Sequence, residues 1–376
     1  MIKHIRIQNF RSLVDVSVDL APLTVLIGRS GTGKSNFVQA IRFLRNLLSQ
    51  PQSVRTNILP AHLKQGTLGY TLRLEIPGYL DELEYSLQLP MTEENITGPA
   101  SERLTSGQST VFHQDKGKWV VAPGITPIPQ PQLMVLRHLS GIREATITHA
   151  ALNSGIGCYD FPGSVLQTAT AAQPQKQAEY GTGFRDDGSD FLATATSIIN
   201  NLERLSDWDT ITESLRAVNR AVKNIDLSRP GLNRLEIALG LNGRLMRLDS
   251  SQESEGFRRF LAHMLALYQS PPKQTLIFEH PEHGIHPGAM TALFEEFEAY
   301  VNSGRGQIIL TTHSPQLLDH FKPENIRVVE MVGQETQIGP LAPEQAEALR
   351  DDLLSTGELL TVDPARLKGQ LAEVPG

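Results

Sequence analysis

Apolar and polar residues alternate along the first twenty positions, through Ile5 and Ile7 and again from Val14 to Leu20. A period of two is typical of half-buried strands, so we expect two strands joined near residues 9–12. The short β-branched run 23–27 predicts a buried strand directly afterwards. Apolar positions then recur with the period of a helix, at Phe37, Ile41, Leu44 and Leu48, and this helix should end near residues 49–51.

The middle of the chain is less regular. Alternation at residues 70–76 and 83–87 predicts an antiparallel sheet. Residues 90–131 are rich in Gly, Pro, Ser and Thr, with strand-like pieces at 110–113 and 118–121. Residues 161–190 are rich in Gly, Ser and Thr, and we expect a long mobile loop there.

Further along, apolar residues spaced by three and four predict an amphipathic helix over residues 207–225. Two strand-like segments, 235–239 and 245–248, flank Asn242-Gly243, a dipeptide that favours a tight hairpin. The last third predicts strands at 274–279 and 307–313, with a helix through Met290, Leu293 and Phe297 between them.

Composition narrows the class of protein. The 376 residues are 40% hydrophobic and 20% charged, with no long apolar run, which is typical of a globular chain without a membrane span. The N-terminus lacks a signal-peptide pattern, and Cys158 is the one cysteine, so we expect a cytoplasmic location. A net charge of −7 argues against nucleic-acid binding by bulk electrostatics, although a local basic groove stays possible.

Residues 28–35 read G-R-S-G-T-G-K-S and match the phosphate-binding pattern G-x-x-x-x-G-K-[ST] at every fixed position. The predicted strand before it and helix after it are the context that this loop requires. Glycines let backbone N–H groups converge on phosphate oxygens, Lys34 supplies positive charge, and the Ser35 hydroxyl can hold Mg²⁺. The alternative is an ordinary glycine-rich turn before a helix.

The last third carries a complementary pattern. The strand 274–279 ends in the carboxylate of Glu279, as a Mg²⁺-orienting Walker B strand does, and the strand 307–313 ends at His313. Between them lies the segment 282–287, E-H-G-I-H-P.

These motifs resemble the RecF-like, ABC-type ATPases of the overcoming-lysogenization-defect and SMC-related group. The resemblance rests on the N-F-R-S opening, Asn36 after the phosphate loop, the segments 279–287 and 311–315, and the tail 357–359. It implies an α/β P-loop NTPase of ABC-ATPase type, with a mixed, partly parallel sheet core, an antiparallel β lobe and a helical insertion. We expect one composite domain, with an N-terminal lobe (1–90), an insertion (91–235) and a C-terminal lobe (236–376).

The same resemblance implies a site for ATP and Mg²⁺. Metal ligands would be Ser35 and Glu279. In the family a signature precedes Walker B, and here Ser254 and Gly256 keep it, so they would close the site of a second subunit; the alternative is a solvated loop before a core helix. The residues expected to bind nucleotide are Arg11, Gly28, Ser30, Gly31, Thr32, Gly33, Lys34, Ser35, Asn36, Ser254 and Gly256.

One position departs from the family pattern. The family has a second glutamate after the metal-binding one, and this chain has His280. A neutral imidazole can accept a proton near pH 7. The catalytic candidates are therefore His280, Glu282 and His313, and hydrolysis is expected to be slow or replaced by stable ATP binding. A metal cluster is a further reading, formed by His280, Glu282, His283, His286 and His313. Pro281 and Pro287 argue against it, because they prevent a helical H-E-x-x-H arrangement.

The resemblance also implies partners. We expect a homodimer or higher homo-oligomer that controls a separate effector, such as a nuclease with a TOPRIM-like domain, in DNA repair or in defence against phage and plasmids. Two alternatives stay open: an ATP-gated scaffold that does not hydrolyse ATP, and a RecF-like protein that binds DNA ends or junctions.

Overall fold

The computed structural model describes residues 1–49, 58–61, 63–92, 95–97, 100–115, 118–121, 134–139, 141–170, 183–227 and 234–369. The chain divides into two compact units. Unit 1 comprises residues 1–156 and 321–376, and unit 2 comprises residues 157–320.

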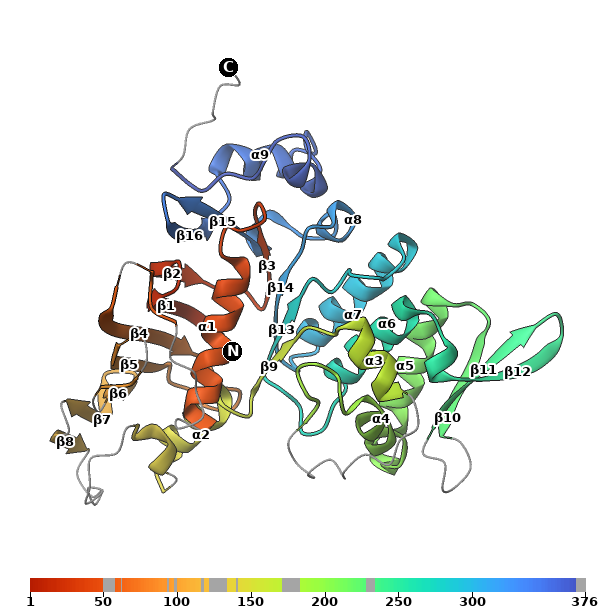
Figure 1. The fold of residues 1–376 in the computed structure, drawn as a ribbon, viewed down its shortest axis with the longest axis horizontal. Helices are drawn as coiled ribbons and strands as arrows, with labels where there is room; N and C mark the ends of the chain where they lie inside the picture. Colours follow the sequence, from red (N-terminus) through yellow and green to blue (C-terminus); the bar gives the residue numbers. More distant parts are fainter. Residues whose placement is uncertain are drawn as a thin grey trace. The chain divides into compact units, whose positions relative to one another are not determined.

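Unit 1 is built mainly from strands (Figure 1). Its strands are β1 (Ile2–Phe10), β2 (Leu13–Asp19), β3 (Leu23–Ile27), β4 (Gln65–Leu74), β5 (Leu83–Thr92), β6 (Ser101–Ser106), β7 (Ser109–Asp115), β8 (Lys118–Val121), β15 (Ile326–Val332) and β16 (Glu335–Pro340). Its α-helices are α1 (Lys34–Ser49), α2 (Arg143–Leu152) and α9 (Pro343–Arg350).

An antiparallel sheet in the order β2-β1-β4-β5-β6-β7-β8 forms the predicted β lobe. Ile5 and Ile7 of β1 are buried with Arg6 exposed between them, and Val16 and Val18 of β2 are buried on either side of an exposed serine, which confirms the two half-buried strands. Helix α1 buries the predicted apolar stripe, and Tyr70 of β4 donates a hydrogen bond to the Ala40 carbonyl of α1 at 2.8 Å. This bond satisfies a polar group inside the core, where an unpaired one would be destabilising.

The second structural element of unit 1 is a three-stranded group. β15 runs parallel to β3, pairing Ile326 with Val25, and antiparallel to β16. All five residues of β3 are buried, as the short β-branched run predicts. The pairing places the last strands of the chain beside the segment that leads into the phosphate loop.

Unit 2 combines short strands with most of the described helices. Its strands are β9 (Ile156–Tyr159, which crosses the boundary between the units), β10 (Val222–Leu227), β11 (Leu235–Leu241), β12 (Arg244–Asp249), β13 (Thr275–Glu279) and β14 (Gln307–Thr311). Its α-helices are α3 (Gly163–Thr170), α4 (Phe191–Ile199), α5 (Leu205–Val218), α6 (Glu255–Leu267), α7 (Met290–Asn302) and α8 (Pro315–Leu318).

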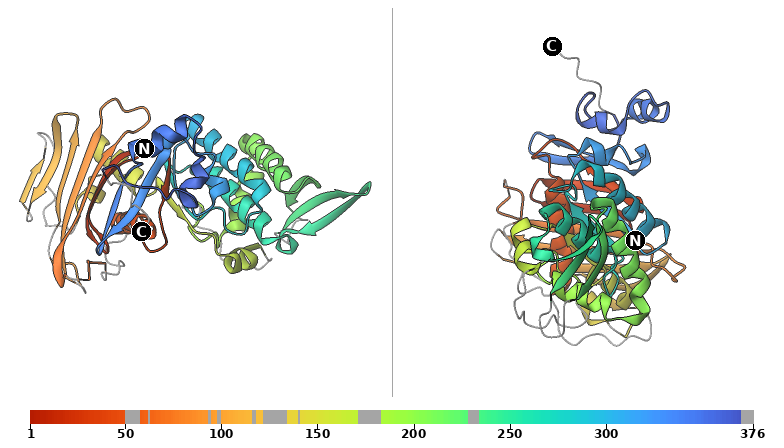
Figure 2. Two further views of the ribbon diagram at one scale, coloured as in Figure 1. Left: turned by 90° about the horizontal axis from the view of Figure 1, so that it is seen from above. Right: turned by 90° about the vertical axis from the view of Figure 1, so that its right-hand side faces the viewer.

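β13 and β14 are parallel neighbours, so their carboxyl ends meet at one edge. The predicted hairpin is confirmed: β11 and β12 are joined at Asn242 and Gly243, both with positive φ, and extend beyond the helices of unit 2 (Figure 2). The mixture of parallel and antiparallel strands with helices confirms the α/β class.

Helix α6 lies at the core of unit 2, and every residue from Phe260 to Leu267 is buried. Next to it, Phe278 of β13 stacks on Tyr159 and Phe297, with ring centroids 5.4 and 5.1 Å apart. Buried aromatic rings contribute several kcal/mol each relative to alanine. This cluster therefore anchors β13 immediately before Glu279.

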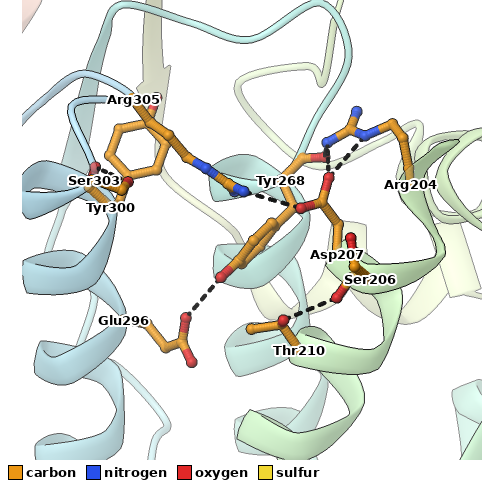
Figure 3. A network of polar contacts seen from close by, with 9 residues as sticks. All are labelled: Arg204, Ser206, Asp207, Thr210, Tyr268, Glu296, Tyr300, Ser303 and Arg305. Carbon is orange, nitrogen blue, oxygen red and sulfur yellow. Dashed lines mark hydrogen bonds and ion pairs between the residues drawn. The ribbon is translucent and has the colours of Figure 1, made fainter.

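A polar network joins three helices of unit 2 at their ends (Figure 3). Asp207 at the start of α5 accepts hydrogen bonds from Arg204 at 2.8 and 2.9 Å and from Arg305 at 3.0 Å. Arg305 also lies over the Tyr268 ring, 4.8 Å from its centroid, while the Tyr268 hydroxyl donates to Glu296 of α7. The network holds the helical layer together through charge-assisted bonds.

Two expectations from the sequence were wrong. The predicted helix 207–225 ends at Val218, and Val222 and Ile225 are buried residues of strand β10 instead. Spacings of three and four cannot distinguish a helix from a turn followed by a strand when the apolar residues are few. The predicted loop 161–190 contains helix α3, and its residues 171–182 lie outside the described part.

The predicted lobe boundaries near residues 90 and 235 stay a prediction. Among the described residues, no helix is both long and apolar enough to cross a membrane.

The buried carboxyl group of Glu102 in unit 1 generates a prediction about stability. The Tyr85 hydroxyl donates a hydrogen bond to this carboxyl group at 2.6 Å. The backbone N–H groups of Val135 and Leu136 also donate to it. Burial nevertheless raises the pKa of Glu102 to about 7. Between the ordinary glutamate pKa of 4.5 and a pH of about 7, Glu102 keeps its proton in the folded chain but has lost it in the unfolded chain. The free energy of unfolding should therefore fall as pH rises from about 5 to about 7 and then level off.

Replacing Glu102 with glutamine should remove this pH dependence, as measured by urea unfolding across the same window. Glu84→Gln on the neighbouring strand, where the side chain is exposed, is the matched control and should retain the wild-type slope. An identical slope in wild type and Glu102→Gln would contradict the assignment.

Candidate functional site

The phosphate-loop motif of unit 1 follows β3 directly and ends at the first turn of α1. Gly28, Gly31 and Gly33 have φ of 151°, 82° and 105°, a region that other residues rarely adopt. A Cβ on Gly28 would lie 2.0 Å from the Val329 carbonyl oxygen of β15, and one on Gly33 would lie 2.0 Å from Thr336 Oγ1 of β16. Both fixed glycines of the motif are therefore required by backbone conformation and by neighbouring atoms.

Thr336 connects the phosphate loop to the rest of unit 1. Its backbone N–H donates to the Ser12 carbonyl at 2.7 Å, and its hydroxyl donates to the Thr32 carbonyl at 2.8 Å. The Ser12 hydroxyl lies 2.7 Å from both Thr336 Oγ1 and Asn36 Nδ2. These contacts tie the loop, the β1–β2 turn and β16 into one hydrogen-bonded group.

Arg11 joins the same group through Asn36. It sits in the β1–β2 turn with φ of 50°, and its Nη1 donates to Asn36 Oδ1 at 3.4 Å. A positive φ in a residue other than glycine is uncommon and is maintained only where surrounding contacts hold it. Here the Arg11 N–H donates to the Ile58 carbonyl, which places the guanidinium beside the start of α1.

Lys34 is buried, and its ammonium group donates to the Gly28 and Arg29 carbonyls at 2.7 and 2.8 Å. Burial lowers its pKa to about 8. Desolvation disfavours the charged form, and an anion next to the ammonium would reverse that effect. Ser30 and Ser35 are exposed on the same loop, and Thr32 is buried beneath it. The start of α1 adds a partial positive charge.

In unit 2, β13 ends at Glu279, which pairs in register with Thr311 of β14. His280 follows with φ of 48°, and its N–H group donates to both the carbonyl and the hydroxyl of Thr311, at 3.1 and 3.2 Å. This pairing fixes the point at which the chain leaves the sheet. The neighbouring strand therefore holds the backbone of both Glu279 and His280.

A tight turn then brings three side chains together. The His283 N–H donates to the His280 carbonyl at 3.1 Å, and the two imidazole rings stack with centroids 4.8 Å apart. Glu282, whose side chain is 9% exposed, lies 3.8 Å from His280 Nδ1. Burial would raise the pKa of Glu282, but His280 and the backbone N–H of His313 outweigh it and hold that pKa below its usual value.

His313 lies at the end of β14, where the backbone turns into α8. Its N–H donates to Glu282 Oε1 at 2.9 Å, and its ring stacks on His280 with centroids 5.2 Å apart. Ser314 caps α8 by accepting a hydrogen bond from the Leu317 N–H. The structure therefore places all three catalytic candidates, His280, Glu282 and His313, in one contiguous group.

The signature residues lie at the start of α6. Ser254 is its N-cap and accepts a hydrogen bond from the Phe257 N–H at 3.2 Å. A Cβ on Gly256 would lie 2.3 Å from the Gly284 carbonyl oxygen, so glycine is required for α6 to approach the turn that follows Glu282. Both residues thus have a structural role, and Gly256 borders the turn that follows Glu282.

Sequence reasoning used Ser12 only as part of the N-F-R-S opening and missed Thr336 as a support of the phosphate loop. Thr336 belongs to no recognisable motif, and its bond to Thr32 joins residues 304 positions apart. The metal-cluster reading included His283, but it could not show that a turn places the His283 ring on that of His280. No periodic signal could have revealed either contact.

The glycine geometry predicts the effect of adding one methyl group to the loop. Gly33→Ala should lower the free energy of unfolding by at least about 2 kcal/mol, because its Cβ would clash with Thr336 and its φ is unfavourable. Gly31→Ala shares the unfavourable φ but meets no atom within 4 Å, so its cost should be only about 1 kcal/mol. Urea unfolding of both variants measures the difference, and equal losses would refute the clash.

Comparison with known proteins places these motifs in a wider group. Residues 1–81 match the family described as "AAA ATPase domain", and residues 176–319 match the family described as "AAA domain, putative AbiEii toxin, Type IV TA system". The first match contains the phosphate loop, and the second contains Ser254, Glu279 and His313.

A curated relative and solved structures agree with this. The OLD nuclease of Thermus scotoductus is 22% identical over 351 residues, which cover 88% of this chain but only 62% of the nuclease. The Smc head bound to the C-winged helix domain of ScpA has a TM-score of 0.57 at 14% identity, covering 92% of this chain and 99% of that one.

The Smc head domain bound to the C-terminal domain of ScpA from Pyrococcus furiosus has a TM-score of 0.53 at 14% identity, covering 94% of this chain and 99% of that one. At these identities the structural likeness shows the fold. Taken with the sequence matches, it confirms the resemblance to ABC-type AAA ATPases that the motifs indicated.

Proposed function

We propose that the protein is an ATP- and Mg²⁺-dependent molecular switch that hydrolyses ATP slowly. The observation that carries this proposal is the phosphate loop itself, with its positive-φ glycines and a buried Lys34 whose ammonium group donates to the Gly28 and Arg29 carbonyls of the loop. A group of this kind gains more from a bound phosphate than a solvated lysine would. The donor set therefore fits the triphosphate of a nucleotide.

Each loop residue has a proposed role in nucleotide binding. Backbone N–H groups from Gly28 to Asn36 surround the phosphates, Lys34 neutralises their charge, and Arg11 supplies a guanidinium suited to phosphate oxygens. The Ser35 hydroxyl and the Glu279 carboxylate are oxygen ligands of the type that Mg²⁺ prefers. Mg²⁺ would neutralise phosphate charge there.

We propose His280 as the general base and Glu282 as its positioning residue. His280 Nδ1 lies 3.8 Å from Glu282, whose pKa is held below its usual value, and a carboxylate at this place would stabilise the positive charge that develops when the ring takes a proton from water. His313 also contacts Glu282 through its backbone, so it can hold the same group in place. A neutral base is less effective than the glutamate of the family pattern, which is why slow turnover is expected.

Dimerisation is part of the proposal. As an N-cap, Ser254 uses an oxygen lone pair to accept from Phe257, which leaves its hydroxyl proton able to donate to a phosphate of a nucleotide held by a second copy. Gly256 and the start of α6 add backbone N–H groups. Two ATP molecules would then join two copies of the chain.

The output that we propose is control of a separate nuclease effector, in DNA repair or in defence against phage and plasmids. Support comes from the similarity to the OLD nuclease, of which this chain spans 62%, and from the Smc heads that were solved with ScpA domains. An ATP-gated scaffold without turnover is favoured by His280 as an alternative. A DNA-end or junction binder is the other, and salt-dependent DNA affinity with and without ATP would distinguish it.

Mg²⁺-dependent phosphate release from ATP tests the assignment of the site. Lys34→Ala should weaken ATP binding about 10- to 100-fold, the cost of a lost charge-assisted bond. His280→Ala should bind ATP normally but turn over about 100-fold more slowly or worse, and His280→Glu should match or exceed wild type.

Each result bears on a different claim. The wild-type protein could instead bind ATP and dimerise without turnover, while His280→Glu gains activity. That result would favour the ATP-gated scaffold over the hydrolysing switch. Unchanged ATP affinity in Lys34→Ala would contradict the nucleotide site altogether.

The lowered pKa of Lys34 predicts how ATP affinity depends on pH. Above about 8 the free chain has lost the lysine proton, and binding the triphosphate must restore it. Affinity should thus fall by up to about tenfold per pH unit above 8, with proton uptake detectable by calorimetry in buffers of different ionisation enthalpy. Lys34→Arg, which stays charged, should show no uptake from this position; a pH-independent wild-type affinity would contradict the prediction.

A further inference from the structure

We propose that His280, Glu282 and His283 form a binding site for a borderline divalent transition cation such as Zn²⁺ or Co²⁺, distinct from the Mg²⁺ position assigned to Ser35 and Glu279. Each of the three residues offers one ligand atom, and these atoms lie within 4.8 Å of one another. Two imidazole nitrogens and one carboxylate oxygen are a donor set that suits zinc.

The backbone already brings the ligands together. The N–H of His280 is held by Thr311, and the turn closed by the His283 N–H on the His280 carbonyl stacks the two rings at an interplanar angle of 15°. A tetrahedral cation with bonds of about 2.0–2.1 Å needs its ligand atoms about 3.4 Å apart. The exposed His283 ring can close the difference by rotating about its side-chain bonds, without movement of the strand ends.

Two buried polar atoms point to a ligand at this place. His280 Nδ1 and Glu282 Oε2 are both inaccessible to solvent and have no hydrogen-bond partner among the described residues. The Glu282 side chain is only 9% exposed, and its other oxygen is used by the His313 N–H. Buried polar groups are usually paired, and a bound cation would satisfy both atoms together.

The chemistry of the donors selects the kind of cation. Mg²⁺ and Ca²⁺ prefer oxygen ligands, and only one of these three donors is an oxygen. Zn²⁺ and Co²⁺ accept imidazole nitrogen readily, and three protein ligands leave a fourth position for water. The prolines that exclude a helical H-E-x-x-H arrangement do not exclude this site, because the turn at Pro281 presents the ligands instead.

A cation here would have a consequence for turnover. It would occupy the side chains of His280 and Glu282, so Zn²⁺ should inhibit ATP hydrolysis reversibly. This consequence rests on the function proposed above, whereas the binding of the cation does not.

The experiment is a titration of the metal-free full chain with Co²⁺ and, separately, with Zn²⁺, in the absence of nucleotide. We expect a single Co²⁺ ion to give the visible absorption of tetrahedral coordination, Zn²⁺ to displace it, and Zn²⁺ to raise the melting temperature by mass action. His283→Gln should weaken binding by more than about tenfold, since loss of even an outer-sphere contact costs that much.

His286→Asn is the matched control. His286 is the next histidine along the chain, and its Nδ1 accepts from the Gly288 N–H, a cap that asparagine can replace. This variant should bind Co²⁺ as wild type does. Since the chain has 11 histidines, the control separates this site from non-specific binding.

Glu282→Gln provides a second test, because glutamine has nearly the same shape as glutamate but lacks its charge. This variant should lose the tetrahedral Co²⁺ spectrum, as His283→Gln should. Absence of that spectrum in wild type, or equal affinity in wild type and His283→Gln, would overturn the proposal. Cation binding without any loss of ATP turnover would leave the site in place and count against the proposed role of His280.

Discussion

The hydrogen bonds of Thr336 are the constraint on which the phosphate loop depends. The loop lies near the start of the chain, yet the residue that fixes its path comes from β16, more than 300 positions later. Thr336 occupies the space that a side chain at position 33 would need, and Val329 occupies the space at position 28. The parallel pairing of β3 with β15 is what brings these atoms to the loop.

In unit 2, a neighbouring strand likewise fixes the backbone at the end of β13. The pairing of β13 with β14 positions Thr311, and Thr311 in turn holds the backbone of His280 in a conformation that it would not adopt alone. Beneath it, the Phe278 cluster keeps the strand rigid. The backbone of His280 is therefore positioned by its contacts with the neighbouring strand.

These two arrangements support one view of the protein. Lys34 and Glu282 are both charged groups kept in partly desolvated surroundings, and such groups respond strongly to a ligand of opposite charge. The loop is suited to an anion, and the turn that follows Glu279 is suited to a cation. ATP binding and divalent-cation binding would thus act on preformed sites whose donors need little rearrangement.

The sequence by itself determined the phosphate loop, the strands and helices around it, the Asn242-Gly243 hairpin and the family. Each of these features depends on a hydrophobic pattern or on residues at fixed spacing. Both kinds of signal are properties of the local sequence. It did not determine that Val222 and Ile225 lie on a strand, because their spacing also fits a helix. Nor could it show that Thr336 braces the loop, or that His280, Glu282 and His283 converge. Those contacts follow from strand pairing and turn geometry, and only the tertiary structure decides which distant backbone and side-chain groups come within hydrogen-bonding distance.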